Sequence, residues 1–190
     1  ARVREVRIDA GRVTALQVDS RTIEIDAAAA VIIAVPPLAA GQLLPGVPVP
    51  TEFRAILNVH FRLPSEPKAA PITGFVGGLS EWLFLRGAVA SVTVSAANAV
   101  IDDDADALGR QIWREIAPVL GFEPDSGFPL CRIVKEKRAT FAATPGQAAL
   151  RPAPGAAGHG NLALAGDWTG TGLPATIEGA IRSGSRAAGL

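Results

Sequence analysis

The sequence predicts an α/β fold in which one domain is interrupted by a second. Apolar runs at residues 27–35 and 162–165 lie near opposite ends of the chain, and such unbroken hydrophobicity favours strands buried on both faces. A helix is expected after the second run, over residues 175–188. Strand and helix patterns are mixed between the two runs. We therefore expect the two ends to form one domain around an inserted one.

The first 25 residues predict three strands. Apolar and charged residues alternate over residues 3–8, and the alternation resumes over 13–18 after an Asp-Ala-Gly-Arg turn. A period of two indicates half-buried strands, here joined as a hairpin. A third strand is expected at residues 22–25.

The middle of the chain predicts a meander of strands after a connector at residues 36–50, which is rich in Pro and Gly. Residues 142–160, where Pro, Gly and Ala dominate, are expected to form a loop. The predicted strands are 56–63, 73–76, 82–85, 88–95 and 131–137.

Residues 102–120 form the clearest helical pattern. The acidic run at Asp102–Asp104 suits a helix N-terminus, and Gly121 suits the position after its last turn. Apolar residues recur at every fourth position of one face, with Trp113 beside them: Leu108, Ile112, Ile116 and Leu120.

These patterns give the predicted domain limits. Residues 1–40 and 150–190 are expected to form one domain, interrupted at 41–149 by a second domain with a mixed β-sheet and a helix.

Composition excludes several classes of function. The 18 basic residues balance the 18 acidic ones, and no dense run of Lys and Arg is present, so nucleic-acid binding is not expected. The two histidines, His60 and His159, lie far apart and lack neighbours at ligand spacing, so no metal site is expected.

The single cysteine, Cys131, excludes an internal disulfide and fits a reducing compartment. No apolar run approaches the roughly 18 residues needed to cross a bilayer, and no signal peptide opens the chain. We therefore expect a cytoplasmic location, with peripheral contact to the inner membrane left open. The absence of Met, together with a start in mid-strand, suggests a piece of a longer polypeptide.

The second apolar run leads into the segment that carries chemistry. Gly166 and Asp167 end the strand, a turn rich in Gly and Thr follows, and the last helix begins. The free N–H groups of a helix start favour an anionic or electron-rich ligand. Gly166 lets the backbone approach that ligand, and Asp167 can accept hydrogen bonds from sugar-like hydroxyls. Small residues share one helix face, which allows close packing: Gly179, Ser183, Gly184 and Ala187.

One match within this segment is misleading. Gly170-x-Gly172-x-x-Ala175 fits the dinucleotide fingerprint, but that fingerprint also requires a second strand and an acidic residue about 20 positions further on. The sequence has no room for them.

The same segment resembles the C-terminal flavin motif of the phytoene desaturase and amine oxidase superfamily. The resemblance rests on Gly166-Asp167, on Pro-Ala-Thr-Ile-Glu-Gly-Ala at 174–180 and on Ser183-Gly184. The sequence Leu-Ala-Gly-Asp-Trp-Thr at 164–169 is similar to the corresponding segment of the squalene-associated FAD-dependent desaturases. Further similar stretches lie at residues 31–37, 58–61, 81–87 and 137–141.

The resemblance implies that the interrupted domain is part of a Rossmann-like FAD-binding domain, that the inserted domain binds the substrate, and that the first domain holds a site for FAD. Gly166 and Asp167 take the position that lies against the ribityl-pyrophosphate part of FAD. Ala175, Thr176 and Ile177 take the position of the helix start, whose N–H groups point at the flavin's N1–C2=O edge and stabilise negative charge there. Val6 is the best match to the strand that touches the adenine end. No cysteine lies shortly before Gly166, so binding is expected to be non-covalent.

The resemblance also implies an activity for the full-length enzyme: FAD-dependent reductive dehydroxylation of hydroxysqualene, an apolar isoprenoid, to squalene in hopanoid synthesis. The piece alone is expected to be inactive. A carotenoid desaturase or a flavin amine oxidase of the same superfamily is the alternative, although Thr176 stands where amine oxidases often place an aromatic residue. A non-catalytic interaction module is a second alternative.

Other side chains are interpreted structurally. His60 is expected to be a satisfied core histidine, Cys131 a buried thiol and His159 an exposed loop residue. Arg138 is a weaker candidate for contact with flavin or substrate. Trp82, Trp113 and Phe141 are expected in the core, with an apolar substrate channel lined by Trp82 and Phe84 as the alternative.

Overall fold

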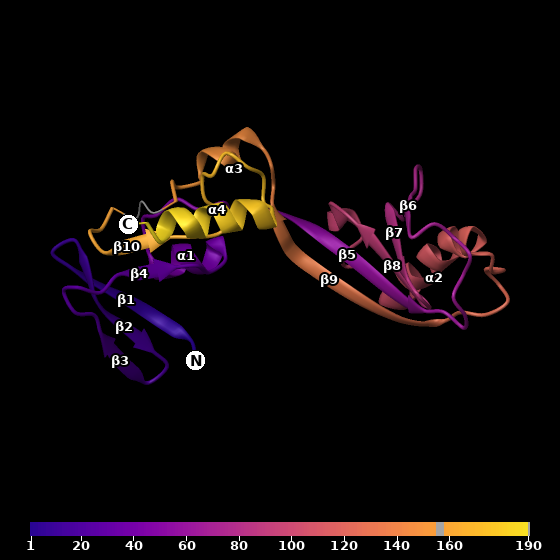
Figure 1. Cartoon of the computed structure of the whole chain (residues 1–190), viewed down its shortest axis with the longest axis horizontal. Coiled ribbons are helices and arrows are strands. Elements are labelled where there is room, and N and C mark those ends of the chain that lie inside the picture. Colours follow the sequence, from indigo (N-terminus) through magenta and orange to yellow (C-terminus); the bar gives the residue numbers. More distant parts are fainter. Residues whose placement is uncertain (155–157, 190) are drawn as a thin grey trace. The chain divides into compact units, whose positions relative to one another are not determined.

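The computed structural model describes residues 1–154 and 158–189, so residues 155–157 of the predicted loop lie outside the described residues. The chain divides into two compact units (Figure 1). Unit 1 consists of Ala1–Glu52 together with Phe141–Leu190, and unit 2 is Phe53–Thr140.

Unit 1 begins with the predicted hairpin and third strand. Strands β1 (Val3–Asp9), β2 (Arg12–Val18) and β3 (Arg21–Glu24) pair antiparallel in that order. Ala10 and Gly11 both have positive φ, 47° and 76°, as a tight two-residue hairpin turn requires.

The two apolar runs form a parallel pair of strands in unit 1, β4 (Val31–Ile33) and β10 (Leu162–Leu164). All three residues of β10 are buried, as predicted. The expectation for the first run was wrong in two respects. Its strand is shorter, because Asp26 accepts the N–H of Ala28 in a local turn, and Ile32 is 47% exposed. Polyalanine hydrophobicity in residues 27–30 therefore did not mark a strand.

Asn161, just before β10, joins the two sheets of unit 1. Its buried side chain accepts the N–H of Val13 at 2.8 Å and donates to the carbonyls of Val13 at 3.0 Å and Ala29 at 3.2 Å. Three hydrogen bonds from one amide fix β2 beside the parallel pair.

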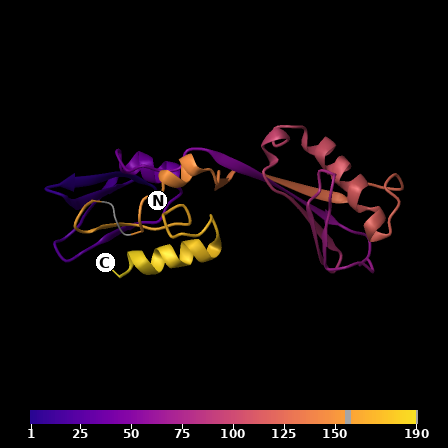
Figure 2. The ribbon, with the colours of Figure 1, turned by 90° about the horizontal axis from the view of Figure 1, so that it is seen from above.

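Unit 1 also contains helices α1 (Pro37–Leu43), α3 (Pro145–Ala149) and α4 (Ile177–Ala187). Helix α4 was predicted, and it lies beside β10 in both Figure 1 and Figure 2. The two short helices lie where a connector and a loop were expected. Each begins with a proline, which is well suited to a first helical position.

Gln147 of α3 attaches the chain on both sides of the insertion. Its side-chain oxygen accepts the N–H groups of Thr51 at 2.7 Å and Glu52 at 3.2 Å, and Ala142 N–H donates to Glu52. As a result, the compact units divide at 52/53 and 140/141, whereas the sequence placed the limits at 40/41 and 149/150.

Unit 2 is a sheet with the strand order β6-β7-β8-β5-β9. The pairings β6–β7, β7–β8 and β8–β5 are antiparallel. The strands are β5 (Phe53–Arg62), β6 (Ile72–Gly74), β7 (Trp82–Arg86), β8 (Val89–Val94) and β9 (Leu130–Phe141).

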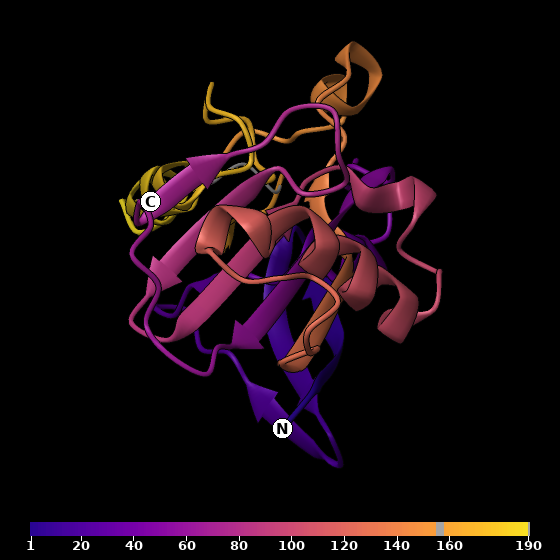
Figure 3. The same cartoon turned by 90° about the vertical axis from the view of Figure 1, so that its right-hand side faces the viewer.

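Helix α2 (Ala105–Ile116) crosses one face of this sheet (Figure 3). The Asp104 side chain caps it by accepting the N–H of Ala107 at 2.9 Å. A short 3₁₀ turn, η2 (Pro118–Leu120), follows and ends at Gly121, which has a φ of 77°. The predicted apolar face is buried against the sheet: Leu108, Ile112, Ile116 and Leu120. A second 3₁₀ turn, η1 (Ala97–Ala99), follows β8.

Trp113 and Phe141 are buried as predicted, but Trp82 is 50% exposed and does not belong to the core. Alternation along β7 gives the core side to Leu83 instead. His159, expected to be exposed, is partly buried.

Candidate functional site

The candidate site is built on the strand-turn-helix from β10 to α4. Gly166 follows the strand with a φ of 146°, a conformation that favours glycine. A Cβ atom at this position would lie 2.5 Å from Nε1 of Trp168. The backbone path out of β10 therefore requires glycine at residue 166.

Buried side chains hold the turn after Gly166. Trp168 is almost fully buried, and its Nε1 donates to the carbonyl of Val35 at 3.0 Å. Ser183 Oγ accepts the N–H of Gly166 at 3.0 Å and lies 2.7 Å from the hydroxyl oxygen of Thr169. The Thr169 hydroxyl also donates to the carbonyl of Gly166 at 3.0 Å. The turn is thus fastened both to the connection after β4 and to α4.

Arg151 supports the same turn from the preceding loop. Its guanidinium donates to the carbonyl oxygens of Asp167, Trp168 and Thr169. Burial lowers the pKa of Arg151, and the nearby Asp167 carboxylate acts in the opposite direction. Sequence reasoning missed this residue. The sequence did offer one signal: Arg151 is the single Asp, Glu, Lys or Arg residue within residues 142–160.

Thr176 begins α4 as its N-cap. Its hydroxyl oxygen accepts the N–H of Gly179 at 3.1 Å, and the first intrahelical bond runs from Ala180 N–H to Thr176 O. The N–H groups of Ile177 and Glu178 precede that first bond and are left for another acceptor. The Ile177 side chain is 83% exposed. This helix end can therefore present backbone donors and a positive dipole end to a ligand.

The structure brings five of the six predicted site residues into one continuous segment. Gly166 is tied to α4 through Ser183, Asp167 follows it and accepts a hydrogen bond from Arg151, and Ala175, Thr176 and Ile177 lead into the same helix. Val6 lies in β1, where it pairs with Leu16, and none of the hydrogen bonds described for unit 1 joins it to the turn.

The glycine turn also contains the misleading fingerprint match. Gly170 N–H donates to the carbonyl of Pro152 at 2.7 Å, so this glycine is already engaged within the protein.

Among residues 1–154 and 158–189, no group of three or more His, Cys, Asp or Glu side chains is placed to hold a metal ion. No helix in this part of the chain is long and apolar enough to cross a membrane.

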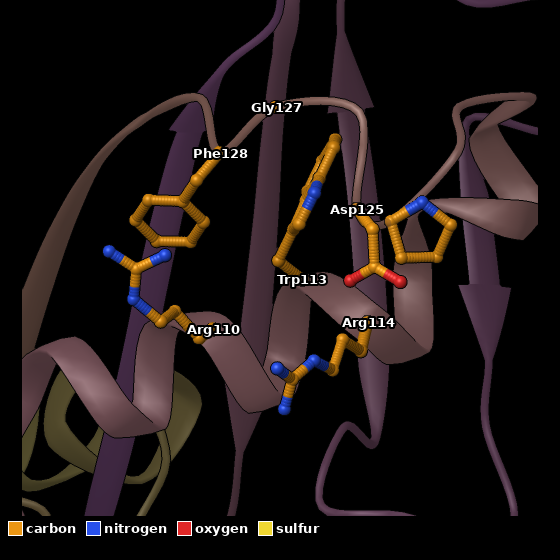
Figure 4. A pocket seen from close by; sticks show the side chains of 7 residues that line it. Arg110, Trp113, Arg114, Asp125, Gly127 and Phe128 are labelled. Atoms are coloured by element: carbon orange, nitrogen blue, oxygen red, sulfur yellow. The ribbon is translucent and has the colours of Figure 1, made fainter.

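A separate hollow of about 130 Å³ is formed entirely by unit 2 (Figure 4). Its walls come from α2 and from the loop before β9, and the Arg110 guanidinium lies over the Phe128 ring, 4.8 Å from its centroid. Trp113 also lines it, but the Nε1 atom of that indole is shielded from solvent. None of the predicted site residues takes part in this hollow.

A buried parallel strand that runs through a glycine turn into a helix N-terminus defines an α/β protein suited to binding a nucleotide-like cofactor. Comparison with known families agrees with this class. The chain belongs to the flavin containing amine oxidoreductase family, whose model matches residues 1–190.

Three relatives named hydroxysqualene dehydroxylase confirm the narrower resemblance. The relative from Sinorhizobium fredii (strain NBRC 101917 / NGR234) is 54% identical over 161 residues, covering 85% of this chain and 38% of its own length. The relative from Rhodopseudomonas palustris (strain ATCC BAA-98 / CGA009) is 50% identical with the same coverage. The relative from Zymomonas mobilis subsp. mobilis (strain ATCC 31821 / ZM4 / CP4) is 39% identical over 189 residues, which are 100% of this chain and 45% of the relative. The chain thus spans less than half the length of these relatives.

Solved structures share the fold. A putative protoporphyrinogen oxidase from Exiguobacterium sp. 255-15 matches with a TM-score of 0.64 at 18% identity, over 99% of this chain and 46% of that one. Cyclohexylamine oxidase from Brevibacterium oxydans IH-35A matches with a TM-score of 0.61 at 17% identity, over 99% and 47%. These likenesses support the predicted α/β class.

Proposed function

We propose that the complete protein is an FAD-dependent enzyme that removes the hydroxyl group of hydroxysqualene reductively to give squalene, for hopanoid synthesis. The observation that carries the proposal is 54% identity, over 85% of this chain, to a relative named hydroxysqualene dehydroxylase. Within the proposal, unit 1 is part of a Rossmann-like FAD-binding domain and unit 2 is the inserted substrate-binding domain.

The residues of the strand-turn-helix fit the cofactor. Gly166 and Asp167 would lie against the ribityl-pyrophosphate part of FAD, and Val6 against the adenine end. The backbone of Ala175, Thr176 and Ile177 would face the flavin ring, where free N–H groups and the helix dipole stabilise negative charge. When bound and reduced, the flavin would supply the hydride that replaces the hydroxyl group, and the hydroxyl group would leave as water after taking up a proton.

The local contacts explain how this chain would prepare that site. Arg151 and Ser183 hold the turn at Gly166 and Asp167 in one conformation before any ligand arrives. Such preorganisation lowers the cost of ordering the site on binding. The Thr176 side chain caps α4, so at this position the backbone would face the ligand. No aromatic side chain stands there to form a cage for an amine. This argues against the amine oxidase alternative.

The cofactor is tested with the full-length protein and its Asp167→Ala variant. We expect purified wild-type protein to retain FAD without a covalent bond and to release it on denaturation. Asp167→Ala should retain less FAD, because it loses the carboxylate that would accept hydroxyl hydrogen bonds. The matched control is Asp9→Ala, an exposed residue at the end of β1. Colourless wild-type protein that gains no thermal stability from FAD would favour a non-catalytic module.

The substrate is tested by supplying full-length protein with hydroxysqualene and chemically reduced FAD and measuring squalene by mass spectrometry. Squalene formation with concomitant flavin oxidation is the expected result. Turnover of an amine or a carotenoid precursor by oxidised protein, with no reaction on hydroxysqualene, would contradict the proposal and support another enzyme of the family.

A further inference from the structure

The hollow of unit 2 has aromatic walls that are held in place by packing. Phe128 lies against α2 at Gly109, where a Cβ atom would be 3.3 Å from Cζ of its ring. The same ring meets Phe61 edge to face, with the centroids 6.2 Å apart. Trp113 packs against Phe61 and Phe122, at centroid distances of 5.4 Å and 6.0 Å. Both walls are therefore ordered before any ligand enters, which lowers the cost of binding.

Two guanidinium groups from successive turns of α2 also line the hollow (Figure 4). Arg110 and Arg114 are four positions apart, so they share one face of the helix. The Arg110 guanidinium lies over the Phe128 ring, which fixes its plane and leaves the N–H groups at its edge available. The ion pairs and the arginine hydrogen bonds of the described part of the chain all involve other side chains. Two like charges thus stand together without an acceptor, and a bound anion would stabilise them.

Trp113 brings a further donor to the same hollow. The residue is 3% exposed, and its Nε1 N–H has no hydrogen-bond partner in the described part of the chain. A buried N–H without an acceptor destabilises the folded state, and native structures rarely contain one. The indole lines the hollow, so an oxygen atom held at its inner end would supply the missing partner.

Asp125 limits the charge that the hollow can accept. Its carboxylate points from the loop before β9 toward α2 (Figure 4). Two guanidinium groups and one carboxylate leave a single positive charge in excess, which a singly charged anion balances. A doubly charged anion would meet repulsion from Asp125. Among singly charged anions, a carboxylate matches the planar fork of donors that a guanidinium presents.

A purely structural role for the three charges is the alternative. Arg114 lies in the last turn of α2, where a positive charge interacts favourably with the helix dipole, and Asp125 would then serve only to offset the arginines. On that interpretation, removing Asp125 leaves two unbalanced arginines and lowers stability. If an anion binds instead, removing Asp125 strengthens its binding. The two interpretations therefore predict opposite effects for the same substitution.

We propose that this hollow binds a singly charged carboxylate that carries a short apolar stem. Arg110 and Arg114 hold the carboxylate. Phe128 and Trp113 contact the stem, and Asp125 discriminates against doubly charged anions. The carboxylate belongs either to a free molecule or to an Asp or Glu side chain in the remainder of the complete protein, since the chain spans less than half the length of its relatives. Neither source depends on the proposed flavin chemistry.

Binding of a free carboxylate is tested on the full-length protein by fluorine NMR of trifluorobutyrate, with the neutral trifluorobutyramide as the matched control ligand. The carboxylate signal should broaden and the amide signal should not. Arg110→Gln and Arg114→Gln should each raise the dissociation constant about two- to fivefold, as expected for an ion pair open to water. Asp125→Asn should lower it and allow sulfate to compete, which sulfate does poorly in wild type. Arg54→Gln, an exposed position in β5, is the control and should change nothing.

The second source gives a different result. If a side chain of the complete protein already fills the hollow, trifluorobutyrate will not bind to wild type. The melting temperature of the full-length protein should then fall in Arg110→Gln and Arg114→Gln and rise in Asp125→Asn, with Arg54→Gln unchanged. These differences should shrink at high salt, because the ion pairs are partly screened.

Three results would overturn the inference: equal binding of the carboxylate and the amide, equal weakening by Arg54→Gln and Arg110→Gln, or no binding combined with unchanged melting temperatures. An effect of Asp125→Asn in the same direction as that of the arginine variants would overturn it as well and assign the three charges a structural role. FAD retention, measured in parallel, should be normal in all four variants. A failure of the carboxylate site therefore leaves the flavin proposal standing, and colourless wild-type protein that binds trifluorobutyrate would refute the flavin proposal alone.

Discussion

Ser183, in the second turn of α4, accepts the backbone N–H of Gly166 at 3.0 Å, so the helix and the glycine turn are fastened by a buried hydroxyl group. The same oxygen lies 2.7 Å from the hydroxyl oxygen of Thr169. Ser183 and Thr169 are both fully buried. One small side chain thus joins the end of β10, the turn and α4, which together form the candidate flavin site.

Replacing Ser183 by Ala should destabilise the protein by about 1–3 kcal/mol, because the partly buried N–H of Gly166 loses its acceptor and the buried Thr169 hydroxyl loses one of its two partners. Urea unfolding of the full-length protein measures this change, and FAD retention should fall with it. Ser185→Ala, on an exposed position of the same helix, is the matched control and should be close to neutral. Equal unfolding midpoints for the two variants would show that the hydroxyl does not support the turn.

Gly166→Ala should also be destabilising, by more than about 1 kcal/mol, because its φ of 146° suits only glycine and the added Cβ would meet Trp168. Displacement of Trp168 should break its bond to Val35 and shift its fluorescence to the red. Gly184→Ala is the control: a Cβ there meets no atom within 4 Å, and alanine gains up to about 1 kcal/mol in a helix. A Gly166→Ala variant as stable as wild type would contradict the close packing.

Periodicity and local chemistry allowed much of this structure to be predicted. The hairpin over residues 3–18 and helix α2 could be predicted because each has a regular repeat of apolar residues along its own sequence. The strand, turn and helix around Gly166 follow from the order of an apolar run, a turn rich in Gly and Thr, and a helical segment. In such segments the local sequence and the tertiary fold favour the same conformation.

The missed features depend on contacts between distant residues. Helix α3 is short, and Gln147 within it bonds to Thr51 and Glu52, which no local pattern reveals. Arg151 donates to three backbone carbonyl groups of the turn. Every residue has such a carbonyl group, so the sequence does not show which ones accept a hydrogen bond. Trp82 was expected in the core, with an apolar substrate channel as the alternative, and alternation along β7 exposes it.

Arg151→Met should loosen the turn that contains Asp167. The variant removes the donors to three carbonyl oxygens, and it also removes the guanidinium that lies over the Phe141 ring, while most of the apolar stem is kept. We expect a lower melting temperature and weaker FAD retention, with partial recovery in Arg151→Lys, since an ammonium group cannot reproduce the planar fork of donors. Arg4→Met, an exposed residue in β1, is the control. Full activity of Arg151→Met with normal FAD retention would show that Arg151 does not support the candidate flavin site.

Glu115 of α2 should make unit 2 sensitive to acid. Its carboxylate accepts the N–H groups of Leu79 at 3.0 Å and Ser80 at 2.7 Å. Burial by itself would raise the pKa of Glu115, but hydrogen bonds from Ser80 and Leu79 outweigh burial and lower it below its ordinary value of 4.5. A lowered pKa in the folded state gives stability that is present above pH 4.5 and is lost as the pH falls through the folded value.

Glu115→Gln should therefore lower the free energy of unfolding at neutral pH, by about 1 kcal/mol for one lost hydrogen bond. It should also flatten the dependence of stability on pH below 4.5, which urea titrations at several pH values measure. Glu66→Gln, at an exposed loop position, should leave that dependence unchanged. An acid profile that is identical in wild type and Glu115→Gln would assign the acid sensitivity to other carboxylates.

Asn161→Asp should lower the free energy of unfolding more than the other substitutions, although it only replaces the amide NH₂ group by an oxygen. The Asn161 amide nitrogen donates to the carbonyls of Val13 and Ala29, and a carboxylate would face both oxygens in a buried position. We expect a loss of about 3 kcal/mol or more at neutral pH, with partial recovery as acid protonates the introduced carboxyl and restores one donor. Asn98→Asp is the matched control, because Asn98 likewise accepts from Ala55 and donates to Phe53 but is exposed to water. Similar losses in the two variants, or no recovery in acid, would mean that burial of the Asn161 amide does not determine how the two sheets of unit 1 are joined.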